Sequence, residues 1–563
     1  MKPAHEKYIP FVPLKMARRA WPDRELKAPP VWCSVDLRDG NQALIDPMNV
    51  REKLELFHTL VDIGVKEIEV GFPSASETEY EFIRTLIEGG HIPDDVTIQV
   101  LVQAREHLIR RTFEAIDGAK HVIFHFYNST STLQRKVVFH TDVEGVKKIA
   151  VDAARLIREL SQPALDAGMD LRYEYSPESF MGTEMDAAVE ICQAVIEAIG
   201  ATPERKVILN LPTTVENCMP NYFADEIEYF ISRLPGRDRA IISLHPHNDR
   251  GEGVATAELG LLAGAERVEA TLFGNGERTG NVDMVTLALN LYTQGVDPKL
   301  DFSDINKIRD VYERVTKMKI GERQPYVGEL VFTAFSGSHQ DAINKGTRYM
   351  EESGTEYWEV PYLPIDPADV GRQYEPIIRI NSQSGKGGSA FVMQHSFGFD
   401  LPKAMHPEFG HIVQVETDRV GKELKPNAIY DLFKTHYIDA VKPYQLVQHS
   451  FAEFTDEAGH SHVTFAGTIR HTDTVFQVQG SGNGPINAFF NAIHGQKMDR
   501  FTFIDYKEHA VKQGSDSQAV AYIHLQDENG RDWFGGGMSH NINLAPLKGI
   551  LSAINRAVNH DGK

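Results

Sequence analysis

The sequence is poor in cysteine, in long apolar runs and in positive charge, and each shortage excludes a class of protein. Its 563 residues include three cysteines, Cys33, Cys192 and Cys218, which stand far apart and form no CxxC pair. This spacing disfavours a disulfide framework or a structural zinc site and favours a reducing cytoplasm. The formal net charge of −21 disfavours nucleic acid and anionic membranes as general partners.

No apolar run reaches the length that a bilayer-spanning helix needs. Residues 1–30 are polar and contain prolines, without the apolar core of a signal peptide, so we interpret them as an N-terminal arm. The chain is too long for one hydrophobic core, and two or more domains are expected. The predicted divisions are an arm at 1–30, a catalytic domain at 31–300, linker subdomains at 301–425 and a C-terminal domain at 426–563.

Strand-like runs alternate eight times with helical patterns inside the catalytic domain. The strands are expected at 31–37, 67–72, 97–102, 121–127, 171–175, 206–211, 241–245 and 267–273. Eight strand–helix units over roughly 250 residues predict a (β/α)8 TIM barrel. A doubly wound open sheet is the alternative, but it usually has fewer units. No GxGxxG motif follows the first strand, so a dinucleotide site has no support.

Polar residues gather where the predicted strands end, which is where a barrel of this kind places its chemistry. They are Arg38 and Asp39 on the first strand, His125 on the fourth, Glu174, Ser176 and Glu178 on the fifth, Thr214 on the sixth, His245 and His247 on the seventh, and Asn275, Glu277 and Arg278 on the eighth. We therefore expect the active site at this end of the barrel.

His245 and His247 predict a metal site. Residues i and i+2 of a strand point to one face, so both imidazoles can hold the same ion, although a His-x-His pair alone is a weak signal. The eighth strand lies between the seventh and the first, which brings Asp39 and Asn281 into the same quadrant. One carboxylate, two imidazoles and an amide oxygen suit a divalent ion such as Mg²⁺, Mn²⁺ or Zn²⁺.

Three motifs carry a resemblance to a known family. The stretches 36–42 (DLRDGNQ), 245–249 (HPHND) and 274–281 (GNGERTGN) together resemble the acyl-CoA-dependent Claisen condensation enzymes of the DRE-TIM metallolyase superfamily. Within it, the chain most resembles the longer form of the 2-isopropylmalate synthases, through further matches at 336–343, 360–364, 381–388 and 480–485. The first motif departs from a stricter Asp-x-Arg-Glu-Gly pattern, which shortens one carboxylate but keeps an oxygen ligand.

The resemblance implies a reaction and roles for the polar residues. Acetyl-CoA would condense with 3-methyl-2-oxobutanoate and water to give 2-isopropylmalate and CoA, the first committed step of leucine synthesis. Mg²⁺ is the first choice of metal, and it would chelate the 2-oxo acid. Arg38 would stabilise the negative oxygen that forms at C2. His125, Ser176 and Thr214 would bind the substrate, and Glu174 would bound the pocket for the branched side chain.

The general base stays open among Glu178, Glu277 and, by resemblance, His339 with Tyr362. The last two follow the barrel in sequence. The family implies that its linker reaches over the barrel of a second protomer, so a homodimer with composite sites is expected.

The glycine-rich loop at 274–280 is expected to approach CoA through its backbone amides, with Asn275, Gly276 and Arg278 as its binding residues. The stretch 381–388 also contains glycines and a lysine, but it lacks the spacing of a phosphate-binding loop, and we interpret it as a linker turn.

The C-terminal domain contains a weak internal repeat. The runs 475–484 and 533–541 are each preceded by strand-like segments and followed by a helical pattern, which predicts two β-β-β-α units in a small α+β domain. The resemblance implies that this domain binds leucine as a feedback inhibitor, with the loop after Asp505, through residue 519, as the expected pocket. A domain that only dimerises is the alternative.

Rival functions keep the barrel and change the reaction. A citramalate or homocitrate synthase would differ in the 2-oxo acid pocket, and a metal-dependent acyl-CoA lyase would run a retro-aldol cleavage at the same metal. A barrel that has lost catalysis and acts as a sensor is a third possibility. The set Arg38, Asp39, His245, His247 and Glu277 weighs against that reading, and fold alone would decide none of them.

Overall fold

The computed structural model describes residues 3–334, 336–374, 388–420, 424–455, 461–494, 498–511 and 517–561. These form two units, one of residues 1–332 and 364–373 and the other of 333–363 and 374–563. Two predicted features lie partly outside the described residues: the glycine-containing turn at 381–388 and, at 512–516, the middle of the expected leucine loop.

The first unit contains a closed barrel in which each strand pairs in parallel with the next and the eighth closes on the first. Its strands are β1 (Val31–Ser34), β2 (Glu67–Gly71), β3 (Thr97–Gln103), β4 (His121–Ser129), β5 (Asp170–Glu178), β6 (Val207–Thr213), β7 (Ala240–Pro246) and β8 (Arg267–Ala270). The predicted barrel is confirmed, and each predicted strand overlaps an observed one.

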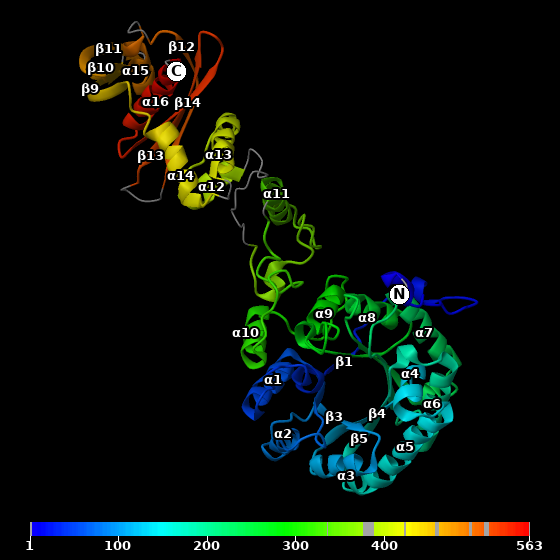
Figure 1. The fold of residues 1–563 in the computed structure, drawn as a ribbon. Coiled ribbons are helices and arrows are strands. Elements are labelled where there is room, and N and C mark those ends of the chain that lie inside the picture. The colour runs from blue at the N-terminus through cyan, green and yellow to red at the C-terminus, as the bar shows by residue number, and fades with distance from the viewer. Residues whose placement is uncertain are drawn as a thin grey trace. The chain divides into compact units, whose positions relative to one another are not determined.

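Helices surround this ring of strands (Figure 1). They are α1 (Val50–Ile63), α2 (Glu77–Glu88), α3 (Glu106–Ala115), α5 (Val143–Asp166), α6 (Met185–Ile199), α7 (Pro220–Arg233), α8 (Gly253–Leu262) and α9 (Met284–Tyr292), with the short α4 (Thr132–Gln134) before α5. Local sequence sets their ends: Asn49 and Glu52 form a capping box at the start of α1, and Gly64 ends it at φ +105°. A further helix, α10 (Ile305–Thr316), packs on α1.

The first strand is shorter than the prediction of 31–37, because the chain turns into a π-helical turn at Asp36–Gly40. The carboxylate of Asp36 is buried and accepts the Leu272 backbone N–H at 3.0 Å, which fixes this turn against the end of β8. Consecutive residues of a strand would point to opposite faces, whereas the helical turn lets neighbouring residues face the same cavity. Arg38 and Asp39 do so here.

The eighth strand also ends before its predicted limit at 273. Residues Leu272–Gly274 form a short helical turn, with Phe273 at φ 57°. None of the helices in the described ranges is long and apolar enough to cross a membrane.

The second unit begins with α11 (Gly337–Ser353) and continues, after its undescribed part, with α12 (Gly388–Phe397), α13 (His406–Val420) and α14 (Pro426–Phe433). Two antiparallel three-stranded sheets follow, each with its own helix, and they confirm the predicted pair of β-β-β-α units. The first comprises β9 (Tyr444–Thr455), β10 (Ser461–His471), β11 (Thr474–Gly482) and α15 (Pro485–Ile493). The second comprises β12 (Phe501–Ala510), β13 (Ala519–Asp527), β14 (Asp532–Ser539) and α16 (Leu544–Asp561).

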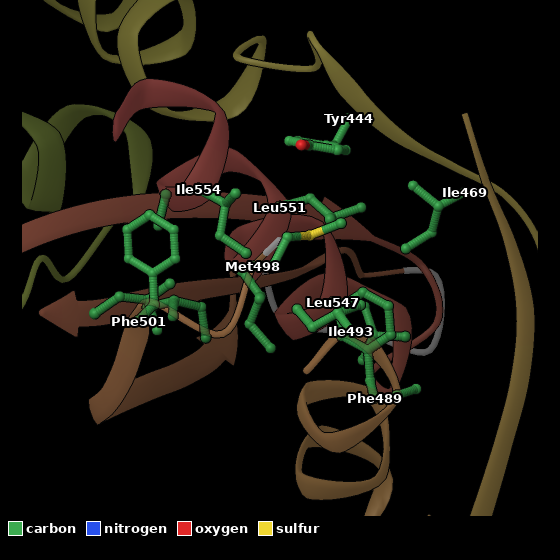
Figure 2. Close-up of a cluster of buried hydrophobic side chains, with 14 of the residues drawn as sticks. Tyr444, Ile469, Phe489, Ile493, Met498, Phe501, Leu547, Leu551 and Ile554 are labelled. Carbon is green, nitrogen blue, oxygen red and sulfur yellow. The ribbon is translucent and has the colours of Figure 1, made fainter. Parts of the chain in front are cut away.

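The two β-β-β-α units share one hydrophobic core, shown in Figure 2, where Phe489 of α15 and Leu547 of α16 lie together. Ile523 and Leu525 of β13 also face this core. The opposite face of the same strand, with Val520 and Tyr522, belongs to a separate core made with helices α12, α13 and α14. The second sheet is therefore covered on both faces.

Candidate metal centre and active site

A cavity of 290 Å³ opens at the carboxyl ends of the barrel strands, where the sequence predicts the site. Its walls come from the ends of strands and the loops that follow them. The lining residues are Arg38, Asp39, Gln42, Phe72, Leu101, His125, Tyr127, Ser176, Glu178, Asn210, Pro212, Thr214, His245, His247, Glu277 and Arg278.

Three of the four predicted metal ligands meet at one point of the wall. Asp39, His245 and His247 each offer one ligand atom, and these atoms lie within 4.8 Å of one another. Nε2 of His245 is 3.1 Å from Oδ2 of Asp39, and Nε2 of His247 is 3.9 Å from the same oxygen. All three residues are buried, so their charges are poorly screened by water.

The fourth predicted ligand, Asn281, is buried beside them. An isolated bridge joins its backbone to that of His247, and its Nδ2 lies 2.8 Å from Oδ2 of Asp39. Its Oδ1 and the Nδ1 of His247 are buried and have no hydrogen-bond partner among the described residues. Rotation of the amide would turn Oδ1 toward Asp39 and His245. An unsatisfied amide oxygen beside one carboxylate and two imidazoles fits a divalent ion.

The electrostatics of this group also fit a cation. Burial raises the pKa of Asp39, but the Arg38 guanidinium and the hydrogen bond with His245 outweigh it and hold that pKa far below its usual value. Burial lowers the pKa of His245, while hydrogen bonds to Asp39 and Glu269 raise it to about 9 overall, so a divalent ion bound here would displace the proton of this imidazole. Burial, together with the neighbouring His245, lowers the pKa of His247 to about 3, which keeps it a neutral ligand.

Two carboxylates hold Arg38 beside the candidate metal ligands. Its Nη1 donates to Asp39 Oδ1 at 2.7 Å, and its Nε donates to Glu69 Oε1. Its Nη2 makes no hydrogen bond within the residues that the structure describes. The guanidinium is therefore a fixed cation on the cavity wall, with the Nη2 amino group left to donate to a ligand.

Three of the predicted substrate-binding residues line the same cavity: His125 of β4, Ser176 of β5 and Thr214, which follows β6. Nε2 of His125 lies 2.8 Å from Oγ of Ser176. The backbone N–H of Ser179 donates to Oγ1 of Thr214 at 2.8 Å, which leaves the hydroxyl hydrogen of Thr214 free to donate. Glu178 is half-buried in the wall and accepts a hydrogen bond from Ser129 Oγ.

Glu174, predicted to bound the substrate pocket, does not line the cavity. It is fully buried, with Oε2 3.2 Å from Nη1 of Arg267 and Oε1 3.5 Å from Nε2 of His125. Burial raises its pKa well above the usual value. The alternation of strand side chains explains this position, because Glu174 lies one register step deeper in the barrel than Ser176.

The glycine-rich loop at 274–280 packs against Asn281, the fourth predicted ligand. A Cβ added to Gly276 would stand 2.0 Å from Asn281 Oδ1. Nδ2 of Asn275 donates to the Gly40 carbonyl at 3.1 Å. Neither Asn275 nor Gly276 lines the cavity, and their predicted contact with CoA stays a prediction.

Glu277 and Arg278 lie at the exposed rim of the cavity. Glu277 accepts a hydrogen bond from Gln42 Nε2 at 3.0 Å. Arg278 pairs with Asp249 through both Nε and Nη2, and its Nη2 also donates to the Thr214 carbonyl at 2.7 Å. These bonds tie together the loops after β6, β7 and β8.

His339 and Tyr362 belong to the second unit. Their rings stack with centroids 4.1 Å apart and an interplanar angle of 27°. The sequence prediction that they act together in a site is compatible with this stacking, and their catalytic role stays a prediction.

A polar layer that the sequence motifs do not predict lies beneath the cavity. Arg267, Glu67, Glu69, Gln99 and Glu269 are buried inside the barrel and contact one another. A signal was present, since polar or charged residues alternate with apolar ones along 67–70, 97–100 and 267–270. A barrel interior usually packs branched apolar side chains, so these positions are exceptional.

Family models match the chain in three consecutive segments. The first, described as HMGL-like, matches residues 29–312. The second, described as alpha-isopropylmalate synthase, post-catalytic domain-like, matches 329–394. The third, described as the LeuA allosteric (dimerisation) domain, matches 423–558.

Curated relatives are similar over the whole chain. The 2-isopropylmalate synthase of Clostridium acetobutylicum is 52% identical over 98% of this chain and 99% of its own length. The enzyme of the same name from Rhizobium johnstonii is 53% identical over 99% of both chains. The one from Brucella suis biovar 1 is 52% identical over 99% of both.

Proposed function

The chain belongs to the 2-isopropylmalate synthase family, and on that premise we propose how its residues carry out the reaction. The protein is an acyltransferase that condenses acetyl-CoA with 3-methyl-2-oxobutanoate and water, giving 2-isopropylmalate and CoA in leucine synthesis. Full-length relatives and the LeuA segment favour this activity over a citramalate synthase, a homocitrate synthase or an acyl-CoA lyase.

One observation carries the site assignment: Asp39, His245 and His247 converge on the wall of a cavity that also contains Arg38. We assign these three residues and Asn281 as ligands of a divalent metal, with Mg²⁺ as the first choice and Mn²⁺ or Zn²⁺ as alternatives. When bound, this ion supplies Lewis-acid polarisation of the 2-oxo group. Arg38 presents its Nη2 amino group to the negative charge that develops at the same carbonyl.

The 2-oxo acid is bound on the other side of the cavity. The Thr214 hydroxyl donates to its carboxylate, and His125 with Ser176 completes the polar wall. Because Oγ1 of Thr214 already accepts the Ser179 N–H, that hydroxyl hydrogen is oriented away from the loop. These contacts fix the acid with its carbonyl toward Arg38, which is the positioning that such a condensation needs.

Glu178 is proposed as the base that removes a proton from the acetyl methyl group. Ser129 holds one of its carboxylate oxygens, and the residue faces the cavity. Glu277 lies at the rim, where it is more exposed, and His339 with Tyr362 lies in the second unit. The loop that carries Asn275, Gly276 and Arg278 is proposed to receive CoA.

Regulation and assembly are proposed from the second unit. We infer that it binds leucine as an inhibitor and that two chains form a homodimer, supported by its match to the LeuA allosteric (dimerisation) domain. The expected cytoplasmic location stays a prediction.

The test is release of the free CoA thiol from acetyl-CoA with Mg²⁺ across a panel of 2-oxo acids, with and without leucine. Preference for 3-methyl-2-oxobutanoate and suppression by leucine are expected. Turnover of pyruvate or 2-oxoglutarate instead would keep the chemistry and change the substrate. No release with any acceptor would contradict the synthase.

A further inference from the structure

Gln99 lies at the centre of the polar layer beneath the cavity. Its side chain is fully buried, and its Nε2 lies 2.7 Å from Glu69 Oε2 and 2.7 Å from Glu269 Oε1. Its Oε1 accepts a hydrogen bond from Arg267 Nη2 at 2.7 Å. Since Arg267 can only donate, it determines which end of the amide faces the carboxylates. Each N–H of the amide is then available to one carboxylate.

Both carboxylates also contact side chains that we place in the active site. Glu69 accepts from Nε of Arg38 and lies 2.7 Å from Nδ1 of His125. Glu269 lies 2.7 Å from Nδ1 of His245. An ionised carboxylate at Nδ1 keeps the proton on that nitrogen, so Nε2 is left to face a ligand. Gln99 does not line the cavity. Glu69 connects it to His125 of the proposed substrate site, and Glu269 connects it to His245 of the proposed metal site.

A second metal ion is the alternative reading of this layer. Ligand atoms of Glu69, His125 and Glu269 also lie within 4.8 Å of one another. Nε2 of Gln99 occupies the space between them, at 2.7 Å from each carboxylate and 3.3 Å from Nδ1 of His125. The amide therefore takes the place that a cation would need, and it holds together two anions that would otherwise repel each other.

We propose that Gln99 is a positioning residue that sets the orientations of His125 and His245 together, and so couples binding of the 2-oxo acid to binding of the metal. The proposal rests on the metal and substrate contacts assigned above. Without the amide, Glu69 and Glu269 each lose a donor and the link between them. Glu69 keeps its bond from Arg38, and Glu269 keeps those from Arg267 and Asn210, but nothing then fixes the two carboxylates relative to each other, and the imidazoles bonded to them shift with them.

The experiment compares wild-type protein with Gln99→Met, which keeps the length of the side chain and removes its donors and acceptor. Metal-free protein is titrated with Mn²⁺, and free Mn²⁺ is followed by electron paramagnetic resonance. Binding of 3-methyl-2-oxobutanoate is then measured calorimetrically at saturating Mn²⁺. Both dissociation constants are expected to rise, that of Mn²⁺ by about 10-fold, the low end for loss of an outer partner of a metal ligand.

Asn128→Leu is the matched control. Asn128 is also a buried amide on a barrel strand, but its partners are the Tyr175 hydroxyl and the carbonyls of Val146 and Ser129, outside the polar layer. This variant is expected to lower the melting temperature and to leave the Mn²⁺ dissociation constant unchanged. A purely structural role for Gln99 would give the same result in Gln99→Met, and that result would overturn the proposal.

Gln99→Asn serves if Gln99→Met does not fold. It keeps the amide, but it is one methylene shorter and cannot reach both carboxylates. Both dissociation constants are therefore expected to rise, by smaller factors than in Gln99→Met. Wild-type protein that binds no Mn²⁺ would overturn the metal site and this inference with it. Wild-type protein that binds Mn²⁺, with unchanged constants in both Gln99 variants, would overturn the inference alone.

Discussion

Gly276 and Asn281 approach each other so closely that a Cβ on Gly276 would stand 2.0 Å from the Asn281 side-chain oxygen and 2.9 Å from its backbone nitrogen. Rotation of the Asn281 side chain alone could not relieve both contacts. The glycine is thus required by the proposed metal ligand that follows it in the same loop, rather than by an unusual backbone angle.

Gly276→Ala is expected to displace Asn281 and weaken Mn²⁺ binding by about 10- to 100-fold, the range found when the support of a metal ligand is lost. The measurement is the Mn²⁺ titration of metal-free protein. Gly321→Ala is the control, because a Cβ there would meet nothing within 4 Å. Equal Mn²⁺ affinities in the two variants would contradict a ligand role for Asn281.

Glu178→Gln is expected to lower kcat by about 100- to 10,000-fold, the contribution of a general base, with little change in metal affinity. Glu277→Gln at the rim is expected to have a much smaller effect. Steady-state thiol release distinguishes them. A larger loss of kcat in Glu277→Gln would identify Glu277 as the base instead.

Stability should depend on pH through Glu226, a carboxylic acid on α7. Its Oε2 is buried without a hydrogen-bond partner among the described residues, and burial, with a contribution from Asp225, raises its pKa to about 8. Between pH 4.5 and 8 the unfolded chain loses this proton while the folded protein keeps it, so stability falls as pH rises through that window.

Glu226→Gln cannot ionise and removes this dependence. Relative to wild type, its melting temperature should therefore rise between pH 5 and pH 9. The exposed Glu114→Gln gives the baseline for loss of a surface carboxylate. Parallel pH profiles for wild type and Glu226→Gln would show that Glu226 ionises normally in the folded protein.

A mixture of two inactive proteins tests the composite site. Asp39→Ala removes a proposed metal ligand from the barrel, and His339→Ala removes the stacked imidazole of the second unit. If each active site uses residues of two chains, mixed dimers contain one intact site and regain activity after unfolding and refolding together. Mixtures that stay as inactive as each variant alone would argue against sharing.

The barrel and the common face of His245 and His247 could be predicted because both depend on local periodicity. Eight alternations define the strands, and the i, i+2 spacing of His245 and His247 fixes their common face. The π-helical turn at Asp36–Gly40 could not be predicted, since its stability depends on a distant backbone N–H at Leu272. The depth of Glu174 could not be predicted either, because depth in a barrel depends on strand register.

The polar layer was not predicted, because the interior of such a barrel is expected to be apolar. Arg267 is buried among Glu67, Glu174 and Glu269, which is costly unless the charges pair well. Their pairing depends on strands β2, β5 and β8, and no local pattern contains that information.

The second sheet of the C-terminal unit is covered on both faces, as described above, by the shared core on one side and by helices α12 to α14 on the other. The two β-β-β-α repeats are therefore unequal in how freely they can diverge. Substitutions on the outward side of β13, at Val520 or Tyr522, must satisfy a second hydrophobic core, whereas Thr464 and Thr468 of β10 belong to neither core. Within a single chain, the second repeat therefore tolerates fewer substitutions on its sheet than the first.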